Sequence, residues 1–86
     1  MTGSGAVDHV RLFVAFPETH VDRPMIYEIV KEYDVVPNIR RANVEDHSGW
    51  VILEISGSHS ACDGAITYLE GLGCTVNRME GDVVEG

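Results

Sequence analysis

The feature that most constrains this chain is the order in which two hydrophobic periodicities follow one another. Alternating apolar and polar residues, as in VDHVRLFVAF at 7–16, predict β-strands, whereas apolar residues spaced three and four apart predict helices. The chain reads in this order: strand 7–16, helical stripe 26–33, strand 36–45, strand 50–56, helical stripe 62–69 and strand 74–79.

This order predicts an α+β fold, the ferredoxin-like βαββαβ sandwich. Because crossovers between parallel strands are right-handed, the two βαβ units and the hairpin between them give a four-stranded antiparallel sheet with both helices on one face. The other face would be bare and would carry Phe13, Trp50 and Ile52. We expect a second copy of the chain to cover that face.

The first helix is expected to begin at Asp22 or Arg23, with Pro24 in its first turn. Its core stripe is predicted from apolar residues at i, i+3, i+4 and i+7, namely Ile26, Ile29, Val30 and Tyr33. In the second helix the corresponding stripe is Cys62, Ala65, Ile66 and Leu69.

The sequence also predicts local features at the ends of elements. Ser60 and Asp63 have the spacing of a capping box for the second helix. The alternation slips between Ile39 and Ala42, which indicates a bulge or an exposed edge. Gly49 is available for a positive φ in the turn that precedes the third strand.

Length and charge limit what the chain can do. Its 86 residues fit one domain, which we place at 7–80, between a flexible Gly-rich leader at 1–6 and an acidic flexible tail at 81–86. A net charge of −8 argues against nucleic acid and anionic lipid surfaces. No signal peptide or membrane-spanning run is visible, so we expect a cytoplasmic protein with two reduced thiols.

No constellation typical of an enzyme or a metal site stands out. His59 and Cys62 form an H-x-x-C pair, but zinc needs three or four ligands, and Cys62 lies on the apolar stripe. Arg23 at a helix start invites comparison with acyl-phosphate hydrolases of this fold, yet the loop at 17–24 lacks their glycine-rich cradle. We therefore expect no catalysis, no metal and no cofactor.

The tripeptide Asn38-Ile39-Arg40, the strand GWVILEISG and the segment AITYLEGLGCTVNRM together resemble the NIL domain, a family named for Asn-Ile-Leu at the first of these places. The resemblance runs from about Val10 to Met79. The family is best known as the C-terminal regulatory domain of methionine-importing ABC transporter ATPases, and it also occurs fused to ferredoxins or alone. The resemblance implies an ACT-related, ferredoxin-like fold that pairs through its sheets.

In the transporter members, paired domains bind methionine near the dimer interface and inhibit transport. Carried over to this chain, the resemblance implies that Asn38 and Ile39 line the pocket. Asn38 offers both a donor and an acceptor to an amino acid. Arg40 stands where the family has leucine, so it either recognises a different anionic ligand or replaces the apolar slot and abolishes methionine binding.

Two further groups complete the predicted site. The start of the first helix, Asp22, Arg23 and Met25, offers a positive dipole end for the carboxylate of a ligand. Phe16 and Ile39 are placed to line an apolar slot for the thioether side chain of a ligand.

Two functions remain open from the sequence. The first is a stand-alone sensing module, a homodimer that binds methionine or a related sulfur metabolite and regulates an unidentified protein partner. The second is an interaction and oligomerisation module with no small ligand, in which the sheet face and the Arg40–Arg41 edge dock a partner. Loss of ligand binding in Asn38→Ala would separate them.

Overall fold

The computed structural model describes residues 7–20, 23–45 and 47–79, and the predicted leader at 1–6 and acidic tail at 81–86 lie outside them. The strands are β1 (Asp8–Phe16), β2 (Val36–Val44), β3 (Gly49–Gly57) and β4 (Thr75–Arg78). The helices are the 3₁₀ turn η1 (Glu18–His20), α1 (Met25–Tyr33) and α2 (His59–Gly71). Both predicted helices and all four predicted strands are present in the expected order.

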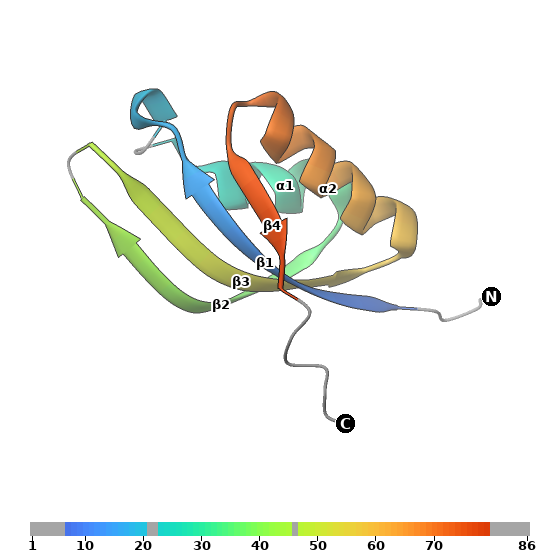
Figure 1. Ribbon diagram of the computed structural model, residues 1–86. Coiled ribbons are helices and arrows are strands. Elements are labelled where there is room, and N and C mark those ends of the chain that lie inside the picture. The colour runs from blue at the N-terminus through green and yellow to red at the C-terminus, as the bar shows by residue number, and fades with distance from the viewer. Residues whose placement is uncertain (1–6, 21–22, 46, 80–86) are drawn as a thin grey trace.

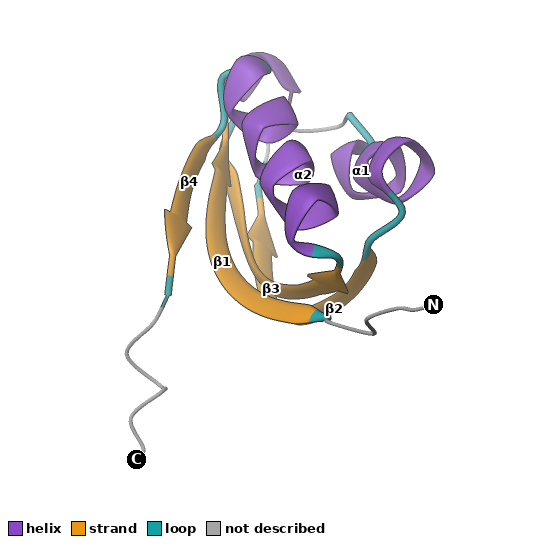
Figure 2. Cartoon of the chain, turned by 90° about the vertical axis from the view of Figure 1, so that its right-hand side faces the viewer, coloured by secondary structure: helices purple, strands orange, loops and turns teal. Residues whose placement is uncertain are grey.

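The four strands form one antiparallel sheet in the order β2-β3-β1-β4 (Figure 1). β1 is therefore a central strand, which agrees with its apolar groups on both faces. Helices α1 and α2 lie side by side on one face of the sheet, and the opposite face carries no element of the described chain (Figure 2). The predicted ferredoxin-like α+β fold is confirmed.

The core lies between the helices and the inner faces of β1 and β3. Alternation puts every second residue of these two strands against the helices, as the sequence predicts. On β3 the inward residues Val51, Leu53 and Ile55 are each no more than 3% exposed. The rest of the buried set is Leu12, Val14, Met25, Ile29, Val35, Cys62, Ala65, Ile66, Leu69 and Cys74.

Helix α1 departs from its predicted stripe. It begins at Met25, because Pro24 has φ −79° and ψ 64°, outside the helical region. Met25 is 1% exposed and belongs to the core, whereas Val30 is 37% exposed. The expectation that Val30 is a core residue is therefore wrong: the buried side of this short helix centres on Met25 and Ile29.

Two local predictions about turns and caps are also wrong. Ser58, not Ser60, caps α2, and its hydroxyl accepts a hydrogen bond from the backbone N–H of Ala61 at 3.1 Å. Gly49 opens β3 without a positive φ. The glycine that needs a positive φ is Gly73, at +95°, where the chain leaves α2 for β4.

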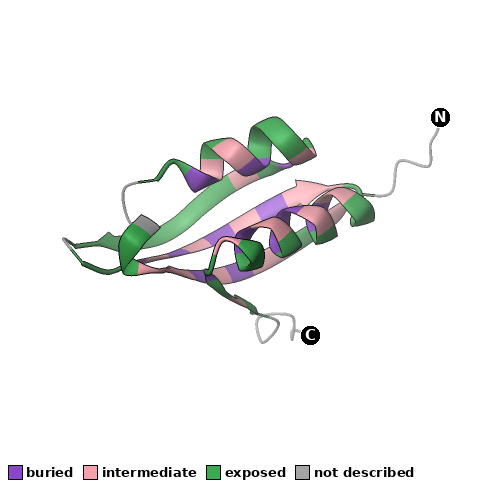
Figure 3. Ribbon diagram, turned by 90° about the horizontal axis from the view of Figure 1, so that it is seen from above, coloured by how far each residue is buried: buried purple, intermediate pink, exposed green. Residues whose placement is uncertain are grey.

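Strand β2 is the exposed edge of the sheet. The predicted irregularity is a register shift between Ile39 and Arg41, which leaves Arg40 without a partner residue on β3. Every residue of β2 except Pro37 is exposed, whereas β3 beside it alternates between buried and partly buried residues (Figure 3). Pairing with β3 therefore does not bury β2, which contributes no residue to the buried core.

Candidate functional site

The structure separates the two residues that the NIL motif would bring together. Asn38 is directly opposite Glu54, and Ile39 is directly opposite Leu53. Residues directly opposite each other on paired strands share a face of the sheet. Because Leu53 faces the helices, Ile39 lies on the helix side and Asn38 on the open side. Asn38 and Ile39 therefore cannot both contact one small ligand lying against a single face.

The other apolar wall that the sequence predicts lies on the helix side as well. Phe16 ends β1 directly opposite Gly49, and its ring is partly buried against the core. Phe16 thus shares a face with Ile39 and not with Asn38. Arg40 is exposed at the bulge, between the open-face residue Asn38 and the open-face residue Arg41, which is opposite Ile52.

The start of α1 is occupied by contacts within the chain. The Nε of Arg23 donates to both carboxylate oxygens of Glu28 at 3.0 Å, and this hydrogen bond raises the pKa of Arg23 above its ordinary value. The Tyr68 hydroxyl of α2 donates to the same carboxylate at 3.0 Å. These contacts join α1 to α2. Asp22, the other polar residue predicted here, lies outside the described residues.

Met25 is unavailable to a surface ligand. Its side chain is 1% exposed, and the Cys74 thiol donates to its sulfur at 3.2 Å. Burial raises the pKa of both Cys74 and Cys62, so the two free thiols are held protonated. Protonated, buried thiols are poor nucleophiles and poor metal ligands.

The open face of the sheet is divided into a polar row and an apolar patch. In the polar row Glu54 of β3 lies between Arg11 of β1 and Asn38 of β2, directly opposite each of them. Two residues further along β1, and on the same face of the sheet, Phe13 is directly opposite Ile52. A cation, an anion and an amide therefore lie in one line beside apolar side chains.

Two stacked aromatic rings make up most of the apolar patch of the open face. The rings of Phe13 and Trp50 are stacked, with centroids 5.8 Å apart and an interplanar angle of 30°. Phe13, Trp50 and Ile52 are each partly buried, and no described element covers them. Aromatic rings in this arrangement offer a flat, polarizable surface to an apolar or sulfur-containing group.

Arg11 and Glu54 were missed as candidates from the sequence, because each looks like a solvated residue on a strand. The signal that would have found them is the register between β1 and β3, which places them directly opposite each other and beside Asn38. Asn38 is thus retained from the predicted site, with a new set of neighbours.

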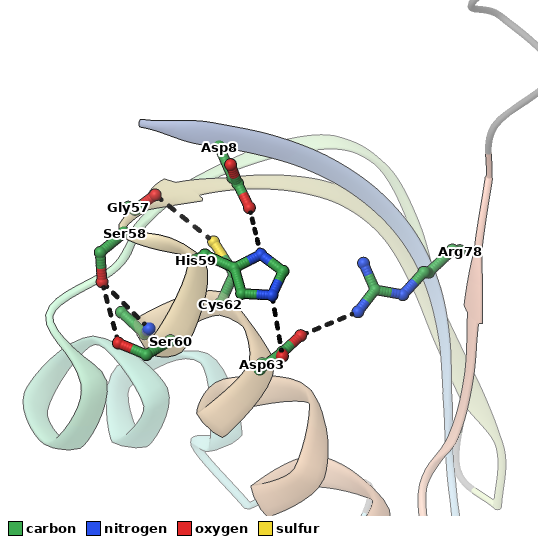
Figure 4. Close-up of polar contacts among 9 residues, drawn as sticks. Asp8, Gly57, Ser58, His59, Ser60, Cys62, Asp63 and Arg78 are labelled. Carbon is green, nitrogen blue, oxygen red and sulfur yellow. Dashed lines mark hydrogen bonds and ion pairs between the residues drawn. The ribbon is translucent and has the colours of Figure 1, made fainter. Parts of the chain in front are cut away.

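A second polar cluster ties three elements together at one end of the sandwich (Figure 4). His59, the first residue of α2, contacts Asp8 of β1 at 2.9 Å through Nδ1 and Asp63 at 3.3 Å through Nε2. Arg78 of β4 reaches Asp63 at 3.1 Å. The hydrogen bond to Asp8 and the charges of both carboxylates raise the pKa of His59.

This cluster is an exposed ion-pair network and not a metal centre. Among residues 7–20, 23–45 and 47–79, no group of three or more His, Cys, Asp or Glu side chains is arranged to hold a metal ion. The H-x-x-C pair of the sequence is split, since His59 is exposed and Cys62 is buried. Within the same described ranges, neither helix has the length and apolar character needed to span a membrane.

Comparison with protein families matches residues 10–78 to the NIL domain. The chain belongs to the NIL domain family. The match spans every strand and both helices, apart from the first two residues of β1. The motif on which the resemblance rested, Asn38-Ile39-Arg40, therefore lies on the exposed edge strand β2, at its bulge.

A curated relative is the iron–sulfur subunit of L-aspartate semialdehyde sulfurtransferase from Methanocaldococcus jannaschii, which is 30% identical over 63 residues. The alignment covers 73% of this chain but 48% of the relative, so this NIL domain chain matches about half of that protein's length.

Solved structures share the fold. The C-terminal domain of an ABC transporter ATP-binding protein from Enterococcus faecalis matches with a TM-score of 0.73, covering 85% of this chain and 86% of that chain at 21% identity. The C-terminal domain of the MgtC protein from Mycobacterium tuberculosis matches with a TM-score of 0.58, covering 98% of this chain and 100% of that chain at 14% identity. At these identities the likeness concerns the fold alone.

Proposed function

We propose that this NIL domain is a regulatory module that binds methionine or a related sulfur amino acid on the open face of its sheet. In the proposal a second copy covers the ligand, and the liganded homodimer regulates an unidentified protein in the cytoplasm. The module itself catalyses no reaction. The observation that carries the proposal is the polar row of Arg11, Glu54 and Asn38 beside the apolar patch of Phe13, Trp50 and Ile52.

The polar row matches the two ends of a zwitterion. The guanidinium of Arg11 is complementary to the carboxylate of an amino acid, and the carboxylate of Glu54 is complementary to its ammonium group. Asn38 can donate to the first and accept from the second. Because directly opposite residues on neighbouring strands are about 5 Å apart, all three groups are within reach of one small ligand.

The apolar patch supports a sulfur-containing side chain. Contacts between a thioether and an aromatic ring contribute about 0.3–1.5 kcal/mol, and Phe13 and Trp50 present two such rings side by side. Membership of a family whose transporter members bind methionine supports the same choice. So does the relative named for sulfur transfer, although that name describes the whole relative.

A second copy is needed because a ligand on a flat sheet stays largely in water. Small-molecule sites generally bury most of the ligand, which one open sheet face cannot do. Two such faces packed about 10 Å apart would enclose it, as in a β-sandwich. They would also bury the apolar patch of each copy.

The test is calorimetric titration of the chain with L-methionine, using two neighbouring variants from opposite faces. Asn38→Ala removes a polar group from the open face and is expected to weaken binding at least about tenfold. Ile39→Ala changes the helix side and is expected to leave the affinity within about threefold. Absence of binding at millimolar methionine, or equal losses in both variants, would contradict the proposal.

A second candidate function is an interaction module that binds no small ligand. It is favoured by β2, which is exposed along almost its whole length and carries Ile39 and Val44 with exposed fractions of 54% and 61%. In that case the chain would associate with itself or a partner while methionine, S-adenosylmethionine and homocysteine all fail to bind. Asn38→Ala would then leave assembly unchanged.

A further inference from the structure

The open face of the sheet extends beyond the polar row. Directly opposite residues share a face, so the open face is made of rows that cross the strands. Next to the polar row lies a middle row, which consists of Arg41, Ile52, Phe13 and Asn77. Beyond it lies a far row, which consists of Asn43 of β2, Trp50 of β3, Ala15 of β1 and Thr75 of β4. Of the far row, the proposed function uses Trp50 alone.

The distance between the rows exceeds the length of methionine. Side chains two residues apart on a strand are separated by about 7 Å, so the far row lies about 14 Å from the polar row. A methionine whose charged end contacts Glu54 places its thioether near Phe13 and ends there. The amide of Asn43 and the hydroxyl of Thr75 then have no part of the ligand beside them. A ligand that uses the whole face therefore carries a further group on its sulfur.

The far row has the chemistry that recognises a purine. Trp50 offers an aromatic surface on which a base can stack, and its ring is stacked with that of Phe13 at 5.8 Å. Asn43 is exposed and directly opposite Trp50, and an asparagine amide can donate to and accept from the edge of an adenine at the same time. On the other side of Trp50, Ala15 has the smallest side chain of the open face of β1, which leaves room for a planar ring.

The charges along the open face match an amino acid that carries an adenosyl group. The polar row contains the opposite charges of Arg11 and Glu54, whereas the far row has no charged side chain. A complementary ligand is zwitterionic at one end and uncharged at the other. Between these ends, Arg41 of β2 and Asn77 of β4 flank the middle row, and both can donate hydrogen bonds to the hydroxyl groups of a ribose.

We propose that the far row is a subsite for adenosine, so that the open face binds an S-adenosyl amino acid. This inference rests on the proposed function, because the amino-acid end of the ligand occupies the same polar row. The sulfur lies beside Phe13, where an aromatic ring suits both a thioether and a sulfonium cation. Asn43 reads the edge of the adenine, and Trp50 stacks on its face.

The experiment is a titration of the chain followed through the fluorescence of Trp50, its one tryptophan. The ligands are L-methionine, S-adenosylhomocysteine and S-adenosylmethionine, and the last two differ in the charge on sulfur. At least one of the two adenosyl ligands is expected to bind about tenfold or more tightly than methionine. The tighter of the two identifies the state of the sulfur that the middle row prefers.

Asn43→Ala separates the two ends of the open face. It is expected to weaken the tighter adenosyl ligand about tenfold and to leave the affinity for methionine within about threefold, because methionine does not reach the far row. Val44→Ala is the matched control, since Val44 is the next residue of β2 and lies on the helix side, directly opposite Gly49. It is expected to leave both affinities within about threefold. Circular dichroism checks that each variant keeps the fold.

The outcomes separate this proposal from the proposed function. Equal affinities for methionine and both adenosyl ligands would overturn the adenosine subsite and leave the methionine site standing. An equal loss of both kinds of ligand in Asn43→Ala would do the same. If none of the three ligands binds at millimolar concentration, the proposed function fails and the adenosine subsite fails with it.

Discussion

Strands β2 and β3 pair along the hairpin with one register shift, yet they have opposite roles. Leu53 of β3 and Ile39 of β2 are directly opposite each other on the same face, but their exposed fractions are 1% and 54%. Both residues are apolar, so composition does not explain the difference. β3 lies inside the sheet and supplies residues to the buried core, whereas β2 is the edge strand, supplies none, and is coloured almost wholly as exposed (Figure 3). Coverage by a second layer, and not pairing within the sheet, decides what is buried.

The two strands therefore contribute to different properties of the domain. β3 supplies Val51, Leu53 and Ile55 to the core and so contributes to stability. β2 contributes no residue to the buried core and places Asn38, Arg40 and Arg41 at the surface. In the proposed function, recognition belongs to β2 and to the open face beside it.

The largest expected effect comes from truncating the two facing residues. Leu53→Ala should lower the free energy of unfolding by about 2–5 kcal/mol, because it leaves a cavity in the core. Ile39→Ala, one strand away, should cost about 1 kcal/mol or less, since its side chain is already half in water. Urea denaturation of both variants measures the difference. Similar losses for the two would show that β2 is covered in solution.

The same contrast between packed and open positions can be tested on α2 with two glycines. A Cβ at Gly64 would lie 2.8 Å from two ring carbons of Tyr33, so Gly64→Ala should force the helices apart and cost about 1–3 kcal/mol. A Cβ at Gly71 meets nothing within 4 Å, and Gly71→Ala should stabilise the chain by up to about 1 kcal/mol. A neutral Gly64→Ala would mean that α1 and α2 are not held this closely.

A smaller effect is expected at the start of α2, where two serines are close in sequence. Ser58→Ala removes the hydroxyl that accepts from the Ala61 N–H and should cost about 0.5–2 kcal/mol. Ser60→Ala should change stability by less than about 0.5 kcal/mol, as for most exposed substitutions. Thermal unfolding of the two variants measures this. The reverse order would restore Ser60 as the cap.

The smallest effect is the pH dependence of the cluster around His59. Its pKa in the folded state lies above the ordinary 6.5, chiefly because of the hydrogen bond to Asp8. The stabilisation is therefore fully present below about pH 6.5 and is lost as the pH rises through the folded-state pKa. An NMR titration of the imidazole should show the raised pKa, and Asp8→Asn should lower it. An unchanged pKa in that variant would remove Asp8 as the cause.

The fold could be predicted because its signals are local and repeated. Alternation assigned the faces of β1 and β3 correctly, and helical spacing identified the buried residues Cys62, Ala65 and Leu69. Short-range detail was less predictable. In α1, which has only nine residues, the predicted stripe included the exposed Val30 and left out the buried Met25. The cap of α2 was assigned to the wrong serine because Ser58 and Ser60 both suit that role.

The candidate site could be predicted only in part, since it depends on register. The sequence indicated Asn38 and suspected a bulge nearby, but a slip of one residue moves a side chain to the other face. Only the pairing of β2 with β3 places Asn38 beside Glu54 and away from Ile39. The pairing of β1 with β3 adds Arg11 in the same way. No single-strand pattern contains that information.

The most direct test of the account is a chemical-shift map of the labelled chain during titration with L-methionine. The account predicts shifts of the backbone amides on the open face, at Arg11, Phe13, Asn38 and Glu54, and of the Trp50 indole. Amides at Ile39 and at the start of α1 should move little. Shifts confined to Phe16, Ile39 and the start of α1, or a spectrum unchanged at millimolar methionine, would contradict it.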